Sequence, residues 1–410
     1  MFSVFEGANN MKLISNIRSL LLSCIIFTLF FYLSSNLYSQ DLITLDLGEQ
    51  YRITERQNLR VRINGSYKGY LFKEYRGFLR RQPGNDNHYK GEYYILQDMK
   101  RDSQLIAKAV DEVYTTDFLL NNAGYISMSE QFEVPLHRSF PSFSFDAVVP
   151  GDSWIASGTD LIYDSNGNFV TIPFLCRYIY RGEDIYQARP VTVIDAQYAL
   201  RYKKGSYDKN ISDIVGINGS LKAVIMLYKD TEGGIFIRTD INQNLSYTNG
   251  STETTTGFAL TWYDGISGSS IESTREKIIS TLENSNNEDI VLEERSNGLV
   301  LQMQNIHFLP DSPIILPEEN SRMNSIAQLL KEAAGSTFLV VGHTADVGTQ
   351  ESQYDLSVER AKAIVDELVL RGIPSKNFLY RGEGGDMPIA SNLTNEGRAK
   401  NRRVEITILD

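Results

Sequence analysis

Apolar and polar residues alternate with a period of two along much of the chain between residues 40 and 267. Leu59, Val61 and Ile63, for example, are separated by polar residues, which is the pattern of a strand with one buried face. Turn residues such as Asn64-Gly65 separate such segments. Similar segments lie at 70–79, 89–96, 169–180, 192–202, 221–229, 234–242 and 257–263. Residues 40–267 therefore predict a β-rich antiparallel domain, either a sandwich or an open barrel.

Two features of this region qualify that prediction. Residues 102–113 form one stretch whose pattern predicts a helix instead of a strand. A transmembrane β-barrel also alternates apolar and polar positions, so it stays an alternative for this region. Several of the segments are short, and Arg and Lys are frequent on them. We therefore favour a soluble β-domain over a barrel that spans a membrane.

The pattern changes after residue 267. Four Ile and Leu residues between 271 and 282 are spaced for one face of a helix, and the polar run 284–289 follows. Residues 268–297 are therefore interpreted as a helical linker. From residue 298 the pattern alternates strands, at 299–308, 338–344, 378–382 and 403–409, with helices at 317–334 and 356–370. Residues 298–410 thus predict a four-stranded β/α sandwich, and the whole chain an α+β multidomain protein.

The first 39 residues have the order of regions found in a secretory signal peptide. Lys12 and Arg18 precede an apolar run over 20–33, which small and polar residues follow. We expect translation to begin at Met11, because the residues before it do not suit a signal peptide. The run is shorter than the roughly 20 residues that span a bilayer, which favours cleavage over an uncleaved anchor. Lipidation at Cys24 is a further alternative, although this cysteine lies near the start of the run.

Composition narrows the chemistry that the chain can perform. The net charge is −11 over 410 residues, which argues against a nucleic-acid partner, because binding to phosphates needs a basic surface. The two cysteines cannot form a disulfide framework or a cysteine-based zinc site, and Cys176 is expected to be buried in a strand. His88 and His137 are isolated in the sequence. We therefore predict no metal, no cofactor and no catalytic residues.

Six motifs in the last quarter of the chain resemble the OmpA-like C-terminal domain family, which occurs in OmpA, Pal and MotB proteins of diderm bacteria. In order, they are Asn305-Ile306-His307-Phe308, Gly342-His343-Thr344, Leu356-Ser357-Val358-Glu359-Arg360-Ala361, Gly382-Glu383-Gly384, Asn392-Leu393-Thr394-Asn395-Glu396-Gly397-Arg398 and Asn401-Arg402-Arg403-Val404-Glu405-Ile406. The resemblance implies non-covalent binding of peptidoglycan in the periplasm or at the outer membrane, and it implies no catalysis.

The resemblance also implies how the stem peptide of peptidoglycan is held. This peptide carries carboxylates and a diamino acid with an ammonium group. Arg360 matches the family arginine that grips the carboxylate, and a planar guanidinium suits this task because it donates two parallel bonds. The family has an Asp fifteen positions earlier, where this chain has Ala345, and the carboxylate comes one position later at Asp346. Either Asp346 takes the ammonium, or the contact is lost and the preferred diamino acid changes, for example to ornithine.

Four further residues complete the predicted peptidoglycan-binding site: Thr344, Gln353, Arg402 and Arg403. Gln353 stands where the family commonly has Asn. Arg402 and Arg403 precede Val404 on the last strand, so we expect one of them to face the cleft and the other to brace the loop at 396–398. The favoured function is a non-catalytic protein that anchors the outer membrane or a periplasmic β-domain to the wall.

A wall-remodelling enzyme that uses its C-terminal domain for targeting is the alternative function. Hydrolysis would need a general acid and a base, and Asp152 near Trp154, or Glu183 with Asp184, are the candidates. Carboxylates in loops between strands are more often turn or solvated residues, so the non-catalytic function is preferred.

Overall fold

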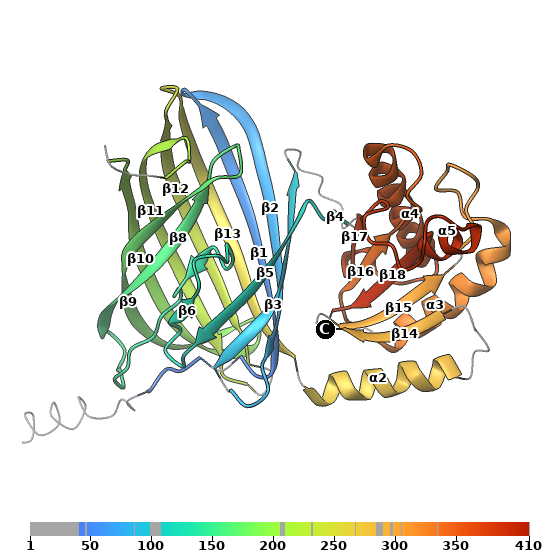
Figure 1. Cartoon of the computed structure of the whole chain (residues 1–410). Helices are drawn as coiled ribbons and strands as arrows, with labels where there is room; N and C mark the ends of the chain where they lie inside the picture. Colours follow the sequence, from blue (N-terminus) through green and yellow to red (C-terminus); the bar gives the residue numbers. More distant parts are fainter. Residues whose placement is uncertain are drawn as a thin grey trace, which may run out of the picture.

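The computed structural model of this chain describes residues 41–409, except 46, 86, 99–107, 206–209, 231–232, 267, 284–289, 296–297, 305 and 334. The predicted signal peptide over 1–39, with Met11 and Cys24, lies outside the described residues. Two domains follow each other along the chain (Figure 1), which confirms the predicted α+β multidomain class. None of the helices in the described ranges is long and apolar enough to cross a membrane.

The N-terminal domain is a twelve-stranded antiparallel sheet that curls into an open barrel (Figure 1), in the order β6-β5-β3-β2-β1-β13-β12-β11-β10-β9-β8-β7. The first and last long strands, β1 and β13, pair from Gln50↔Ile266 to Ile63↔Glu253. Of the two predicted β architectures, the open barrel is thus the one observed. The strands are β1 (Gln50–Ile63), β2 (Ser66–Arg81), β3 (His88–Asp98), β5 (Glu112–Leu120), β6 (Ile126–Met128), β7 (His137–Arg138), β8 (Ser153–Tyr163), β9 (Phe169–Tyr186), β10 (Arg189–Lys203), β11 (Ile214–Tyr228), β12 (Ile235–Tyr247) and β13 (Thr252–Ile266).

The C-terminal domain is a six-stranded sheet with the order β14-β15-β18-β16-β17-β4. Ile326 of α3 and Ile364 of α4 pack with Val340 and Ile406 of the sheet, so the helices cover one of its faces. The strands are β14 (Ile290–Arg295), β15 (Gly298–Gln304), β16 (Phe338–Gly342), β17 (Phe378–Gly382), β18 (Arg403–Ile408) and β4 (Lys108–Ala109). The helices are α2 (Gly268–Glu283), η1 (Pro317–Glu319), α3 (Asn320–Glu332), α4 (Gln350–Leu370), η2 (Ser375–Asn377) and α5 (Asn395–Asn401).

Two sequence interpretations differ from the structure. The helix predicted over 102–113 is wrong in its described part, because β4 and the start of β5 lie there. The helix in the predicted linker 268–297 is present as α2, but its Ile278 is fully buried in the core of the C-terminal domain. The end of the same segment forms β14, which pairs with β15. The linker is therefore largely a part of the C-terminal domain.

The outer face of β2 and β3 packs on the face of the C-terminal sheet that the helices leave open. Phe78 and Tyr94 lie in one apolar cluster with Leu339, Val341 and Leu379. Their packing is extended by β4, a segment of the N-terminal domain that pairs in parallel with β17. An interaction through both side chains and backbone therefore joins the two domains. We call this contact the seam.

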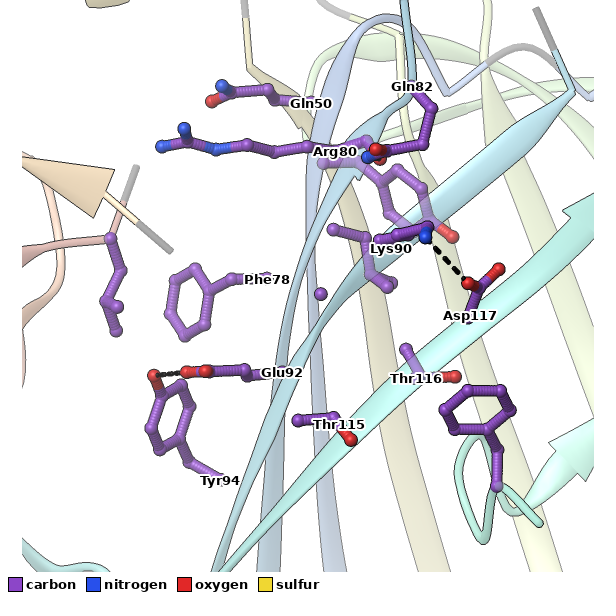
Figure 2. Close-up of a pocket in the computed structure, with 15 residues that line it drawn as sticks. Gln50, Phe78, Arg80, Gln82, Lys90, Glu92, Tyr94, Thr115, Thr116 and Asp117 are labelled. Carbon is purple, nitrogen blue, oxygen red and sulfur yellow. Dashed lines mark hydrogen bonds and ion pairs between the residues drawn. The ribbon is translucent and has the colours of Figure 1, made fainter. Parts of the chain in front are cut away.

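Among the pockets that lie between the two domains, two have volumes of about 410 and 250 Å³. The larger is lined by residues of β1, β2, β3 and β5 and by Leu409 of the C-terminal domain. Figure 2 shows Gln50 and Arg80 extending across it, with Phe78 and Tyr94 below them. The smaller lies between β1, β2 and β13 on one side and Thr337 and the η2 segment on the other.

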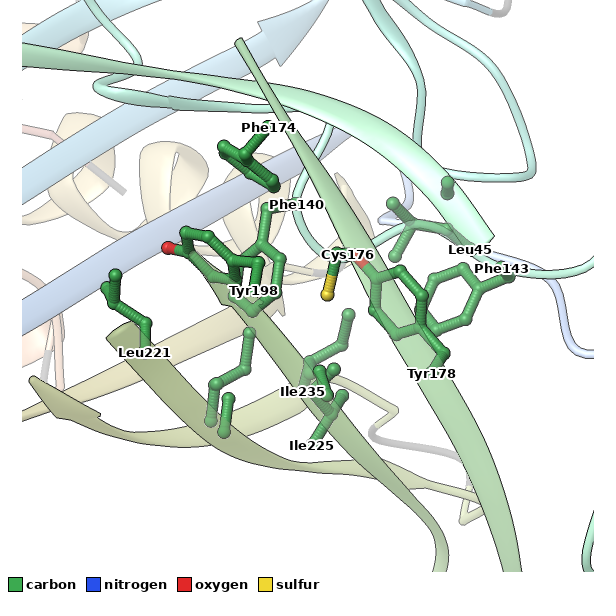
Figure 3. Close-up of a cluster of buried hydrophobic side chains, with 14 of the residues drawn as sticks. Leu45, Phe140, Phe143, Phe174, Cys176, Tyr178, Tyr198, Leu221, Ile225 and Ile235 are labelled. Atoms are coloured by element: carbon green, nitrogen blue, oxygen red, sulfur yellow. The ribbon is translucent and has the colours of Figure 1, made fainter. Parts of the chain in front are cut away.

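The interior of the curled sheet is apolar and rich in aromatic side chains. The rings of Phe174 and Tyr198 stack with centroids 4.0 Å apart, and Phe140 packs beside both (Figure 3). Cys176 is fully buried among them, which confirms its predicted position in the interior. Burial raises the pKa of this thiol to about 12.

The outer face of the same strands carries charged side chains. Arg177 of β9, Lys222 of β11 and Asp240 of β12 lie near mid-strand and are exposed. Exposed apolar side chains, such as Ile155, Leu175 and Ile185, lie among them.

We predict that packing at the seam contributes strongly to the stability of both domains. Phe78→Ala should lower the free energy of unfolding by about 3 kcal/mol, because it removes a buried ring and leaves a cavity. Tyr67→Ala is the matched control on the same strand, since Tyr67 is 52% exposed, and it should change stability by less than about 0.5 kcal/mol. Urea unfolding followed by circular dichroism measures both, and equal effects would contradict the prediction.

Candidate functional site

Arg360 lies in the third turn of α4, a helix whose N-cap residue Thr349 accepts a hydrogen bond from the backbone of Ser352. The arginine is only 7% exposed. Its Nε donates to the main-chain oxygen of Ser312 at 3.2 Å, and its guanidinium carbon lies 4.8 Å from the centroid of the Phe308 ring. Both contacts orient the guanidinium, and neither neutralises its charge.

The charge of Arg360 has no carboxylate ion-pair partner among the residues that the structure describes. Burial lowers the pKa of Arg360, the nearby Arg402 lowers it further, and Asp311 acts in the opposite direction. A buried cation near a second cation is unfavourable, because burial removes the Arg360 guanidinium from water and no described carboxylate pairs with it. A ligand carboxylate placed near both arginines would relieve this cost. The site is therefore prepared for an anion.

The residues predicted to bind the ammonium group lie around the loop between β16 and α4. Ala345 is 6% exposed, whereas Asp346 is exposed at the rim. Gln353 donates through Nε2 to Oδ1 of Asp346 and to the main-chain oxygen of Gly348, both at 3.2 Å. The backbone N–H of Asp346 donates to Oδ1 of Asn392 at 3.3 Å. The structure thus brings Asp346 and Gln353 together, and Oδ2 of Asp346 has no partner among the described residues.

Thr344 fixes this loop through a backbone hydrogen bond. Its N–H donates to the main-chain oxygen of Gly384 at 2.8 Å, while its buried hydroxyl has no partner within the described ranges. The neighbouring His343 is also buried, and neither ring nitrogen is hydrogen-bonded to a described residue. Burial, with Arg403, lowers the pKa of His343 to about 3. The imidazole is therefore neutral and adds no charge to the site.

The two consecutive arginines before Val404 have different environments. Arg402 is exposed and close enough to Arg360 to affect its pKa. Arg403 is 4% exposed and donates through Nε to Oε1 of Glu405 at 2.7 Å. Its side chain lies on the face of the sheet away from the helices, so it does not join the group around Arg360. Among the described residues its side-chain hydrogen bond goes to Glu405 and not to the segment at 396–398, which lies in the short helix α5 capped by Thr394.

Three contributors to the site had little or no sequence signal. Ser312 provides only a main-chain oxygen, which any residue could provide, and Phe308 lies in a recognised motif without an assigned role. Asn401 is fully buried, and its Nδ2 donates to Oδ1 of Asn392 at 2.8 Å. Its Oδ1 accepts the backbone N–H groups of Ile389 and Ala390. The asparagine motifs therefore shape the loop that holds Asp346.

The carboxylates nominated for hydrolysis occupy structural positions. Asp152 accepts from the backbone N–H of Val149 at 2.9 Å, Glu183 pairs with Lys229, and Asp184 accepts from the backbone N–H of the next residue. The histidines that are isolated in sequence are paired in space, His88 with Asp117 at 2.6 Å and His137 with Asp160 at 2.7 Å. Groups of three or more side chains suited to a metal ion are absent from the described part of the chain.

Comparison with known proteins places residues 307–402 within the model of the OmpA family. The peptidoglycan-binding protein ArfA of Mycobacterium tuberculosis is 39% identical over 103 residues, which are 25% of this chain and 32% of ArfA. The probable lipoprotein YiaD of Escherichia coli is 34% identical over 113 residues, 27% of this chain and 52% of YiaD. A solved outer membrane protein of Borrelia burgdorferi is 35% identical and has a TM-score of 0.26, covering 30% of this chain and 97% of that protein.

These matches concern only a part of each relative. The chain spans about a third of the length of ArfA and about half of that of YiaD. The family match does not extend into the twelve-stranded sheet. The similarity therefore applies to the C-terminal domain.

The buried Glu405 is expected to make the free energy of unfolding depend on pH. Burial alone would raise its pKa, but hydrogen bonds from Arg295 and Arg403 lower it from 4.5 to about 2. A depressed pKa stabilises the folded state above the unfolded pKa, and this contribution is lost as the pH falls from about 4.5 through about 2. Glu405→Gln should therefore lower the free energy of unfolding at pH 7 by about 2 kcal/mol. The difference in stability between the variant and the wild type should disappear as the pH falls from about 4.5 through about 2.

The control for this experiment is Glu293→Gln. Glu293 contacts the same Arg295 at 2.7 Å, but its side chain is 50% exposed, so its effect should stay below about 0.5 kcal/mol. Urea unfolding at several pH values measures both variants. A Glu405→Gln effect that is constant from pH 7 to pH 2 would show that the carboxylate does not titrate as described.

Proposed function

Because residues 307–402 form a domain of the OmpA family, homologous to Pal and MotB, we propose that this chain binds peptidoglycan non-covalently and without catalysis. The observation that carries the proposal is Arg360, a buried guanidinium without a carboxylate partner in the described residues. The similarity of this domain to ArfA, whose name describes peptidoglycan binding, supports the same ligand.

In this proposal the site recognises the stem peptide as a zwitterion. Arg360 binds a carboxylate through its planar fork, and Arg402 adds positive charge on the same side. Asp346 receives the ammonium group of the diamino acid through its unpartnered Oδ2. Gln353 and Asn392 hold Asp346 in place, and Thr344 fixes the loop from which it projects. Arg403 is proposed as a structural residue that serves the sheet and not the ligand.

We further propose that the protein acts in the periplasm of a diderm bacterium, where it links its β-domain to the wall. The charged residues Arg177, Lys222 and Asp240 on the outer face of the β-domain support an aqueous environment, and the seam holds this domain firmly on the wall-binding domain. Release by osmotic shock is expected for the soluble form, whereas extraction only by detergent would indicate membrane attachment.

Substitution of Arg360 tests the proposed carboxylate site. Arg360→Lys keeps the charge but loses the bidentate geometry, and Arg360→Ala loses both, so retention on purified sacculi should fall in that order. The alanine variant should bind at least about tenfold more weakly, because a charge-assisted hydrogen bond to a carboxylate is lost. Lys362→Gln, an exposed position on the same helix, should bind like the wild type. Equal retention of all four proteins would contradict the site.

Substitution of Asp346 tests the proposed contact with the diamino acid. Asp346→Asn should reduce retention on sacculi that contain diaminopimelate, since the amide no longer attracts an ammonium group. Asp355→Asn on the exposed face of α4 is the control. Sacculi with ornithine test whether the shift of the carboxylate from 345 to 346 changes the preferred diamino acid. Equal retention of the wild type and Asp346→Asn on both kinds of sacculus would exclude a role for Asp346.

A further inference from the structure

The smaller pocket at the seam has a strongly basic lining. Arg52 and Arg56 of β1 and Arg76 of β2 line one wall, and Lys376 of η2 lines the other. Asp264 is the one acidic residue among the described residues that line it. This concentration of positive charge stands out in a chain whose net charge is −11. It requires an explanation beyond ordinary surface composition.

The arginines of this pocket are held in place by a buried carboxylate. Glu74, 1% exposed, accepts from Nε of Arg76 at 2.6 Å and from Nε of Arg56 at 3.2 Å. Arg76 also donates through Nη1 to the main-chain oxygen of Lys376 at 3.4 Å. The guanidinium carbon of Arg56 lies 5.6 Å from the centroid of the Trp262 ring. These contacts orient the cations, and they leave other donor groups available.

The charges around the pocket do not balance. Arg52 lies 3.6 Å from Asp264. The other three cationic side chains, Arg56, Arg76 and Lys376, are accompanied by one carboxylate, Glu74, which leaves two positive charges. The ammonium of Lys376 and the terminal nitrogens of Arg56 have no hydrogen-bond partner in the ranges that the structure describes. Cations gathered in a partly enclosed space repel each other, so an anion that enters the pocket would be bound favourably.

We propose that this pocket binds a phosphate group, carried by a phosphomonoester. Its donors approach from different walls, which suits a tetrahedral anion with oxygens in several directions better than a planar carboxylate. The two uncompensated charges match a phosphomonoester, which carries close to two negative charges at neutral pH. Because the walls belong to both domains, the bound anion bridges the seam. The phosphate can belong to a soluble compound or to a lipid headgroup.

Calorimetric titration of the full chain with glycerol 3-phosphate tests this site. The wild type should show saturable binding, and both Arg56→Gln and Lys376→Gln should weaken it about tenfold or more. Lys376 is exposed, so its variant should fold normally, which thermal melting can verify. Arg62→Gln is the control, because Arg62 lies on the same strand but at its exposed end, outside the pocket.

A second experiment distinguishes a lipid headgroup from a soluble compound as the carrier of the phosphate. Phosphatidylcholine vesicles with and without phosphatidic acid are sedimented with each protein. Sedimentation that needs phosphatidic acid and is lost in Arg56→Gln assigns the pocket to a lipid headgroup, whereas binding of glycerol 3-phosphate alone assigns it to a soluble compound. Absence of saturable binding to either probe, or unchanged affinity in both variants, overturns the proposal. Arg56→Gln should still be retained on sacculi, so the outcome is independent of peptidoglycan binding.

Discussion

The arrangement of this protein depends on how the open face of the C-terminal sheet is covered. Helices cover one face of that sheet, and Leu339, Val341 and Leu379 project from the other. An apolar face of this kind is unfavourable in water. Phe78 and Tyr94 of the β-domain cover it, and β4 extends it by two backbone-paired residues. The domains are therefore joined through a hydrophobic surface and not only through the chain between them.

This constraint leaves the helix side of the C-terminal domain available for binding. Arg360 lies on that side, buried by its own domain and without a neutralising carboxylate in the described residues. Such a group is costly to the folded state, as buried unpaired charge generally is. Functional sites commonly contain destabilising features of this kind. By contrast, Arg403 and Glu405 form a paired and hydrogen-bonded network that stabilises the sheet.

Alternation and motif spacing predicted the long elements well, since strands such as β9 and β11 expose one face and bury the other over many residues. The same reasoning was wrong for 102–113, because the two-residue strand β4 is too short to show a period. It also could not show that α2 belongs to the C-terminal core, since an amphipathic helix does not specify its partner. Arg402 and Arg403 are adjacent in the sequence. Only the tertiary structure shows that Arg402 is exposed near Arg360, whereas Arg403 is buried beside Glu405.

By itself, the sequence determined the class of each domain, the position of the OmpA-like motifs and the identity of Arg360 and Asp346 as candidates. These depend on local periodicity and on residue types at fixed spacing, both of which are visible in one dimension. Only the tertiary structure decided that the two domains share a seam, that Gln353 and Asn392 hold Asp346, and that cations from distant segments line one pocket. These features arise from contacts between residues far apart in the chain, and the sequence pattern does not encode such distances.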